Sequence, residues 1–203
     1  MIRDDIDHER RKLFIGLTGA VGAVGAVGAA VPFVGSWMPS AKARAAGAPV
    51  TVDVGKLMPG QKMVVEWRGK PVWVIRRTPD MLNDLTKIVD ELRDPNSEVE
   101  TQQPKYAANK TRAIKEELLV LVGLCTHLGC SPLFKPEVDT AEFGKNWFGG
   151  FYCPCHGSKF DLAGRVYKGV PAPTNLEVPP YFYVTDEVIT IGDDGSSTEE
   201  GVA

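Results

Sequence analysis

The chain begins with a charged segment that changes abruptly into a long apolar run. Residues 1–12 are densely charged, whereas residues 13–34 contain no charged side chain. A helix of roughly 22 residues rises about 33 Å, which is close to the hydrocarbon thickness of a bilayer. The pattern therefore predicts a transmembrane helix at residues 13–36, with residues 1–12 as a cytoplasmic tail.

Arg10 and Arg11 directly precede the apolar run, as two arginines do in twin-arginine export signals. The match is partial, because Glu9 stands where Ser or Thr is usual. Residues 37–49 are rich in small residues and predict a flexible tether. They include Ala43-Arg44-Ala45, which is similar to a signal-peptidase site, so a retained anchor and a cleaved leader both stay open. The length of the apolar run favours the anchor.

From residue 50 onward, short runs rich in Val and aromatic residues alternate with turns. Runs of this kind are typical of β-strands. The predicted strands occupy residues 51–54, 62–67, 71–76, 117–124, 181–184 and 188–191. The last two runs flank Thr-Asp-Glu and predict a hairpin.

One stretch of the chain changes to a helical period. Apolar residues between Met81 and Leu92 recur at helical spacing, which predicts one amphipathic helix over residues 80–92. Residues 95–111 then predict a long loop. The patterns together predict a mainly β head domain at residues 50–203, an antiparallel β sandwich or partly open barrel with one helical insertion.

Composition supports this picture and narrows the function. The 21 glycines and 15 prolines among 203 residues suit a turn-rich β fold. The net charge of −3 leaves no basic footprint for nucleic acid, so no nucleic-acid partner is expected. All four cysteines and two of the three histidines lie between residues 125 and 156, which marks the candidate chemistry.

Two short blocks contain these residues. The first is Cys-Thr-His-Leu-Gly-Cys at 125–130, and the second is Cys-Pro-Cys-His-Gly-Ser at 153–158. A Cys-x-His pair and a Cys-x-x-His pair can be read in them. Those four candidate ligands are Cys125, His127, Cys153 and His156, and they leave Cys130 and Cys155 as a second pair.

Three assignments of these six residues are open. A structural zinc site could use a mixture of Cys and His. A four-cysteine [2Fe–2S] site would leave both histidines idle, and a zinc site would leave two thiols unexplained. A two-Cys, two-His [2Fe–2S] site with Cys130 and Cys155 as a disulfide uses all six, and export would let that disulfide persist. The third assignment is favoured, with zinc as the main alternative.

Three motifs, CTHLGC, CPCHGS and KGVPAPTNLEVP at 168–179, resemble the Rieske iron–sulfur subunit of bacterial cytochrome bc1 complexes. The resemblance covers nearly the whole chain and implies one Rieske-type [2Fe–2S] cluster in a subdomain at about 123–178. It implies that Cys125 and Cys153 hold the inner iron, His127 and His156 the outer iron, and that Cys130 and Cys155 form a disulfide.

The resemblance also implies roles for residues around the cluster. A third loop over the cluster would contain Pro171 and Pro173, and Leu128 would lie at the tip against the quinol pocket. Gly157 would permit a turn, and Ser158 would donate a hydrogen bond to a bridging sulfur.

The function implied is that of a ubiquinol–cytochrome c reductase subunit. His156 would contact quinol and accept its proton, while the electron passes from the cytochrome b site to cytochrome c1 and contributes to proton translocation. The chain would span the bacterial inner membrane once, with a periplasmic head, in a complex that is dimeric. The catalytic subunit of an oxygenase is excluded because the head has no third histidine for a mononuclear iron site, and the export signal argues against a ferredoxin-like oxygenase carrier. The Pro-rich stretch disfavours a Rieske subunit of another respiratory enzyme.

Two departures from the family are visible. The spacer between His127 and Cys153 is longer than usual, and its extra length lies in residues 134–147, a polar loop that is either surface elaboration or a partner contact. Phe160 stands where high-potential members have a tyrosine that donates to a ligand sulfur. We therefore predict a lower reduction potential than in those relatives.

Overall fold

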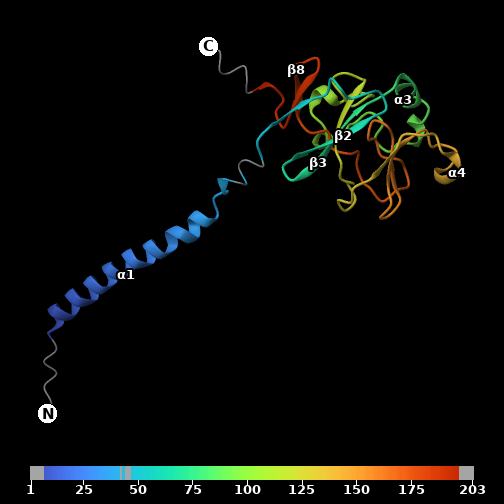
Figure 1. Ribbon diagram of the computed structural model, residues 1–203. Helices are drawn as coiled ribbons and strands as arrows, with labels where there is room; N and C mark the ends of the chain where they lie inside the picture. The colour runs from blue at the N-terminus through green and yellow to red at the C-terminus, as the bar shows by residue number, and fades with distance from the viewer. Residues whose placement is uncertain (1–6, 42, 44–46, 197–203) are drawn as a thin grey trace. The chain divides into compact units, whose positions relative to one another are not determined.

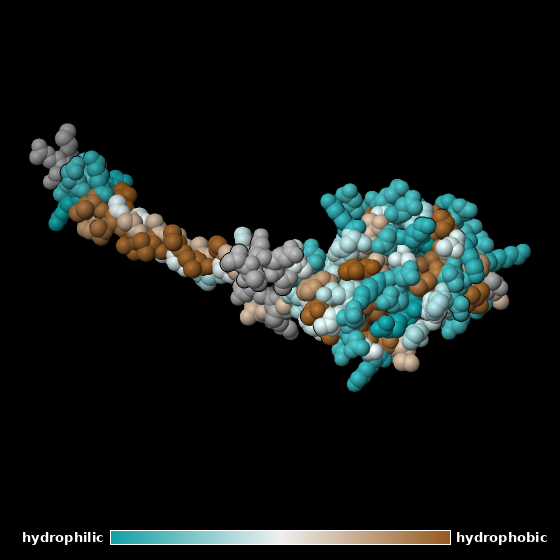
Figure 2. Space-filling model, turned by 90° about the horizontal axis from the view of Figure 1, so that it is seen from above, coloured by the Kyte–Doolittle hydropathy of each residue, from teal (hydrophilic) through white to brown (hydrophobic). Residues whose placement is uncertain are grey.

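The computed structural model describes residues 7–41, 43 and 47–196 and divides into two compact units, Met1–Ala45 and Ala46–Ala203. In the first unit, helix α1 (His8–Ser36) is long and apolar enough to cross a membrane (Figure 1). Figure 2 shows hydrophobic side chains along much of this helix and hydrophilic ones at its N-terminal end. The finding agrees with the predicted anchor in length and composition.

The ends of α1 follow ordinary capping chemistry. The Asp7 carboxylate accepts hydrogen bonds from the backbone N–H groups of Glu9 and Arg10, both at 3.2 Å, and so caps the helix start. The helix therefore begins before the apolar run and includes the twin arginines. Residues 1–6 of the predicted tail, and residues 42 and 44–46 of the predicted tether, lie outside the described residues.

The second unit contains three antiparallel three-stranded sheets, as expected for the mainly β head. Their strand orders are β1-β9-β8, β2-β3-β4 and β5-β6-β7. The strands are β1 (Val50–Asp53), β2 (Lys62–Trp67), β3 (Lys70–Arg76), β4 (Leu118–Val122), β5 (Leu133–Lys135), β6 (Gly150–Cys153), β7 (Ser158–Phe160), β8 (Tyr181–Thr185) and β9 (Val188–Ile191). The six predicted strands and the hairpin at 181–191 are thus confirmed.

Strand β4 connects the core to the candidate site. All five of its residues, Leu-Leu-Val-Leu-Val, are buried, which explains why its sequence shows no alternation. Gly123 follows directly, where a Cβ atom would collide with the indole of Trp73. Glycine is therefore needed to bring the chain close to the Trp73 ring on its way to Cys125.

The prediction of one helix over 80–92 is wrong. The structure instead has a short α3 (Pro79–Asp84), a turn, and a single 3-10 turn at Val89–Glu91. The periodic positions Leu85, Ile88 and Leu92 are nevertheless buried. The chain leaves the helical path after Asp84, and at Leu92 it is extended and forms a β-bridge with Tyr167. Burial at helical spacing does not require a continuous helix.

Residues 95–111 form the expected long loop, interrupted by 3-10 turns at Glu100–Gln102 and Lys105–Ala107. The expectation of a polar loop at 134–147 is wrong in part. This stretch contains the end of β5 and the short helix α4 (Thr140–Phe143), which lies at the periphery of the unit (Figure 1). Phe143 and Trp147 within it are buried, because Ile88, Leu92 and Tyr167, which are distant in sequence, pack against them.

Candidate metal centre

The first block forms loop 1, residues Cys125–Cys130, after strand β4. The backbone N–H of Cys125 donates to the carbonyl of Cys130 at 2.7 Å, and the N–H of Gly129 donates back to the carbonyl of Cys125 at 2.9 Å. Gly129 has a φ of +79°, in the left-handed region that favours glycine. These bonds fold the loop back on itself, so that Cys125 lies at its base.

The second block forms loop 2, residues Cys153–Ser158, which joins β6 to β7. Cys153 and Ser158 pair across this hairpin. The N–H of Gly157 donates to the carbonyl of Cys153 at 2.9 Å, and Gly157 has a φ of +77°. The expected role of Gly157 in the turn is therefore visible in its backbone.

The four candidate ligands divide by depth. Cys125 and Cys153 are 3% and 2% exposed, and neither is in a disulfide. Burial raises the pKa of the Cys153 thiol, and the neighbouring Cys125 thiol raises it further. His127 is half-buried and His156 is exposed, and their ring centroids lie 4.8 Å apart at 90°. Two sulfur donors thus lie inside and two nitrogen donors lie outside.

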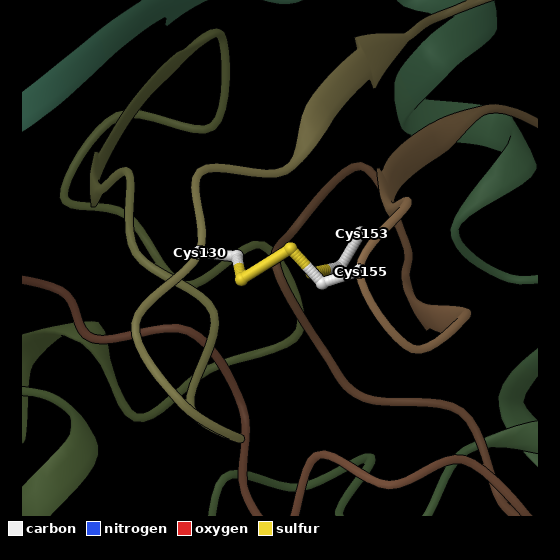
Figure 3. A group of neighbouring side chains, drawn as sticks. All are labelled: Cys130, Cys153 and Cys155. Atoms are coloured by element: carbon white, nitrogen blue, oxygen red, sulfur yellow. A yellow bond between two sulfur atoms is a disulfide. The ribbon is translucent and has the colours of Figure 1, made fainter.

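Cys130 and Cys155 form a disulfide between the two loops (Figure 3), which confirms the expected pairing. The sulfur atoms of Cys130, Cys153 and Cys155 all lie within 4.8 Å of one another. Distance alone would make these three a metal-binding group, but a disulfide sulfur has no thiolate to offer a metal. The four-cysteine assignment is therefore incompatible with this arrangement, whereas the two-Cys, two-His donor set fits a Rieske-type cluster.

A third loop, residues Val170–Pro173, lies against loop 2. The N–H of Ala172 donates to the hydroxyl oxygen of Ser158 at 3.0 Å, which leaves the Ser158 hydroxyl hydrogen available as a donor. Loop 1 is joined to Thr174, the residue directly after the third loop, because the Thr126 hydroxyl donates to the carbonyl of Thr174 at 2.8 Å. The three loops are therefore tied together by side-chain hydrogen bonds.

The predicted residues around the centre fall into two groups. Leu128 is 72% exposed, and Pro171 and Pro173 are also exposed. Ser158 and Phe160 are fully buried. The apolar side chains at the surface are available to a partner, whereas Ser158 and Phe160 act only inside the head.

A buried ion pair behind loop 2 was not predicted from the sequence. Asp161 and Arg165 pair at 2.7 Å with both side chains at most 2% exposed, and Asp161 also accepts from the N–H groups of Ala163 and Arg165. The sequence feature that could have predicted this pair is the spacing of Asp161 and Arg165, two opposite charges four residues apart shortly after the second block. Because the carboxylate is fully satisfied, the pair fixes the turn that follows β7.

Buried arginines surround the same turn. Burial lowers the pKa of Arg77 and of Arg112 to about 10, so both remain charged at neutral pH. Arg77 donates to the carbonyl of Leu162 at 3.2 Å, and Arg112 donates to that of Ala163 at 3.3 Å. Charged donors thus satisfy the turn's backbone carbonyl groups inside the head.

Comparison with known families covers both units. Residues 49–181 match the Rieske [2Fe-2S] domain. Residues 3–40 match the family described as "Ubiquitinol-cytochrome C reductase Fe-S subunit TAT signal", which supports the twin-arginine prediction. The two matches follow each other along the chain in the predicted order of signal and head.

Curated relatives match over almost the full length. The ubiquinol-cytochrome c reductase iron-sulfur subunit of Allochromatium vinosum is 55% identical over 197 residues, covering 97% of this chain and 95% of that protein. The subunit of the same name from Bradyrhizobium diazoefficiens is 40% identical over 188 residues, covering 92% and 96%. A solved chain from "Hyperthermophilic respiratory Complex III" is 32% identical with a TM-score of 0.45, covering 86% of this chain and 97% of that chain.

The match to the Rieske [2Fe-2S] domain sets aside the zinc alternative. By its domain, its signal segment and its full-length relatives, the chain belongs to the Rieske [2Fe–2S] family and, within it, to the iron–sulfur subunits of ubiquinol–cytochrome c reductase.

Proposed function

We propose that this chain is the electron-carrying subunit of a membrane-bound ubiquinol–cytochrome c reductase. It takes one electron and one proton from quinol at a cytochrome b subunit and passes the electron to cytochrome c1. The observation that carries the proposal is the donor arrangement, with two free buried thiols, a half-buried and an exposed imidazole in ring contact, and a disulfide joining their loops. Relatives of the same length bear the corresponding name.

Cys125 and Cys153 would hold the inner iron of the cluster, and His127 and His156 the outer one. A bound [2Fe–2S] cluster supplies one-electron chemistry, at a potential raised because two neutral imidazoles replace two thiolates. Burial of the two cysteines keeps water from the sulfur side, while the histidines remain accessible to a partner.

His156 is the proposed quinol contact. Its ring is exposed, so after one nitrogen is used as a ligand the other can accept a hydrogen bond and then a proton from a quinol hydroxyl. Leu128 and Pro171 are exposed apolar neighbours in the other two loops. They would exclude water from this hydrogen bond when the tip enters an apolar quinol pocket.

The proposed location follows from α1. Arg10, Arg11 and Lys12 at the start of the helix would remain on the cytoplasmic side of the inner membrane, which sends the head to the periplasmic side. The tether at 37–49 would let the head move between cytochrome b and cytochrome c1 in a dimeric complex.

The test is redox-titrated electron paramagnetic resonance on membranes, with and without an inhibitor of the quinol-oxidation site. We expect a [2Fe–2S] signal whose line shape changes when the inhibitor binds. His156→Gln should abolish the signal, whereas His8→Gln, a matched change outside the head, should leave it intact. A colourless, signal-free protein containing one zinc ion would overturn the proposal.

A further inference from the structure

The long spacer contains a small aromatic core of its own. We call residues 134–148 the spacer segment. Its Phe143 and Trp147 are 8% and 1% exposed, and they form a cluster with Ile88, Leu92 and Tyr167 that is separate from the main core. The Phe143 and Trp147 rings lie 4.7 Å apart, and the Trp147 and Tyr167 rings 6.1 Å apart. A segment that served only as surface elaboration would not need two buried aromatic side chains.

This aromatic cluster reaches loop 2 from behind. The ring of Phe143 lies 5.0 Å from that of Tyr152, the residue before Cys153. The ammonium group of Lys159 donates to the carbonyl of Phe143 at 2.6 Å. Lys159 follows Ser158 in β7. The spacer segment therefore contacts both strands of the hairpin that presents Cys153 and His156, since its first two residues, in β5, also pair with β6.

The same cluster supports the start of the third loop. The Tyr167 hydroxyl donates to the carbonyl of Asn146 at 3.1 Å, and the Tyr167 N–H donates to the carbonyl of Lys159 at 3.1 Å. Val170, the first residue of the third loop, packs against the cluster. Tyr167 thus connects the spacer segment, strand β7 and the third loop at one point.

Segment 90–93 also holds the third loop, and it contacts the spacer segment directly, because the Asn146 amide donates to the Glu91 carboxylate at 2.7 Å. The Lys168 N–H donates to the carbonyl of Glu91 at 2.8 Å, and the Lys168 ammonium group donates to that of Asp90 at 2.7 Å. The Arg93 guanidinium donates to the carbonyl of Val170 at 3.1 Å. The third loop, although exposed at its prolines, is held by contacts that reach it from two directions.

We propose that the spacer segment holds loop 2 and the third loop in the geometry that the redox centre requires, with Trp147 and Tyr167 as positioning residues. The proposal rests on the proposed function and deepens it, because these are the loops that carry Cys153, His156 and Pro171. Under this proposal, the additional length of the spacer serves to support the site within the same chain.

The test compares conservative variants of the full chain in the purified complex. Tyr167→Phe removes only the hydroxyl, Trp147→Phe reduces the stacking surface, and Lys159→Met removes the ammonium group but keeps an apolar stem. Hydrogen exchange of residues 168–173 is the main measurement. We expect exchange about two- to tenfold faster in each variant, because each removes contacts of roughly hydrogen-bond strength from the closed state.

Two variants serve as matched controls. Tyr183→Phe also removes a tyrosine hydroxyl, but that hydroxyl is buried without a hydrogen-bond partner among the described residues and lies in β8. Val138→Ala alters an exposed side chain, 54% accessible, within the spacer segment itself. Both should leave the exchange of residues 168–173 unchanged.

A second measurement shows whether the positioning matters for the reaction. In Tyr167→Phe, quinol oxidation per cluster should fall about two- to tenfold while the cluster content, measured by electron paramagnetic resonance, stays at the wild-type level. If the Trp147→Phe variant does not assemble into the complex, the Tyr167→Phe variant alone tests whether the spacer segment positions the loops.

The proposal is overturned if residues 140–148 exchange faster in the variants while residues 168–173 exchange as in the wild type. That result would show a spacer segment that rests on the head without holding the loops. Failure of the proposed function has a different signature, since the unmodified protein would then lack the [2Fe–2S] signal. Hydrogen exchange requires neither quinol nor electron transfer.

Discussion

Loops 1 and 2 have the same local turn but different surroundings. In each, a glycine four residues after the first cysteine donates its N–H to that cysteine's carbonyl at 2.9 Å. The φ angles of the two glycines, Gly129 and Gly157, differ by only 2°, at +79° and +77°. The backbone around the two buried cysteines is therefore built in the same way twice.

The side chains on these two turns are not equivalent. The histidine stands two residues after the cysteine in loop 1 and three residues after it in loop 2. His127 is half-buried, and His156 is exposed. Because the histidine stands one position later on the turn in loop 2, its imidazole is more exposed than that of His127. His156 is therefore the better candidate for contact with quinol.

The support behind the loops also differs. Loop 2 is the turn of a hairpin, and β7 contacts both the third loop and the spacer segment through Ser158 and Lys159. Loop 1 ends in the disulfide, and it is also held by its own backbone bonds, by Thr126 and by the burial of Cys125 in the main core. The disulfide therefore matters more for loop 1, because the strands on either side of loop 2 pair with each other, whereas β4 and β5, on either side of loop 1, belong to different sheets.

Breaking the disulfide should have the largest effect on this comparison. Cys155→Ser removes a link across 25 residues, which in the chain-entropy model is worth about 3.5 kcal/mol of stability. Denaturant unfolding of the detergent-solubilised subunit measures that loss. Hydrogen exchange should show a greater loss of protection in loop 1 than in loop 2.

A thiol reductant provides the control. It should bring the wild-type subunit to the stability of Cys155→Ser and should not change that variant further. Equal loss of protection in both loops would contradict the idea that strands β6 and β7 hold loop 2 independently.

Alanine at the two matched glycines should have an intermediate and equal effect. Beyond the adjacent residues, no atom of the part of the chain that the structure describes lies within 4 Å of a Cβ built at Gly129 or Gly157, so the cost is backbone strain, about 1–2 kcal/mol in each case. Denaturant unfolding of the two variants measures it. Gly150→Ala is the contrasting variant, because its Cβ would collide with the carbonyl oxygen of Phe160 and the β6–β7 pair would have to shift.

A clear difference between Gly129→Ala and Gly157→Ala would show that the loops' surroundings change the cost of the turn. The two backbones would then have the same geometry, but replacing their glycines would cost different amounts of stability. If the two variants lose the same stability within experimental error, the result supports the view that backbone strain at the glycine alone sets the cost.

The smallest expected effect concerns Phe160 in β7, the strand that follows loop 2. Phe160 is fully buried and provides no hydrogen-bond donor. Phe160→Tyr should raise the midpoint potential by roughly 40 mV, the one-electron equivalent of a hydrogen bond worth about 1 kcal/mol to a ligand sulfur. Redox-titrated electron paramagnetic resonance measures it, with Phe148→Tyr in the spacer segment as the control. No shift, or a downward one, would mean that Phe160 only packs.

Local sequence features predicted much of this molecule. The six strands follow from short Val- and aromatic-rich runs, and the disulfide followed from the resemblance of the two motifs. The four ligands remain a prediction that the arrangement of their side chains supports. The helix over 80–92 was predicted wrongly, since it ends at Asp84 and Leu92 pairs instead with Tyr167, a residue far along the chain. A periodic pattern reports which side chains are buried, and more than one backbone path can bury them.

The spacer shows the same limit. Its polar composition predicted a surface loop, but Phe143 and Trp147 are buried by Ile88, Leu92 and Tyr167. These neighbours come from segments about fifty residues earlier and about twenty later in the chain. No local window contains both sides of that contact.

The sequence by itself determined the chemistry of the donors and the turns that carry them, because ligand type and the left-handed backbone of glycine are properties of single residues and their spacing. Only the tertiary structure decided which imidazole faces outward, which loop depends on the disulfide, and what supports the third loop. These outcomes depend on burial and on hydrogen bonds between distant segments, such as the one from Lys159 to the carbonyl of Phe143, and those contacts exist only after the chain has folded.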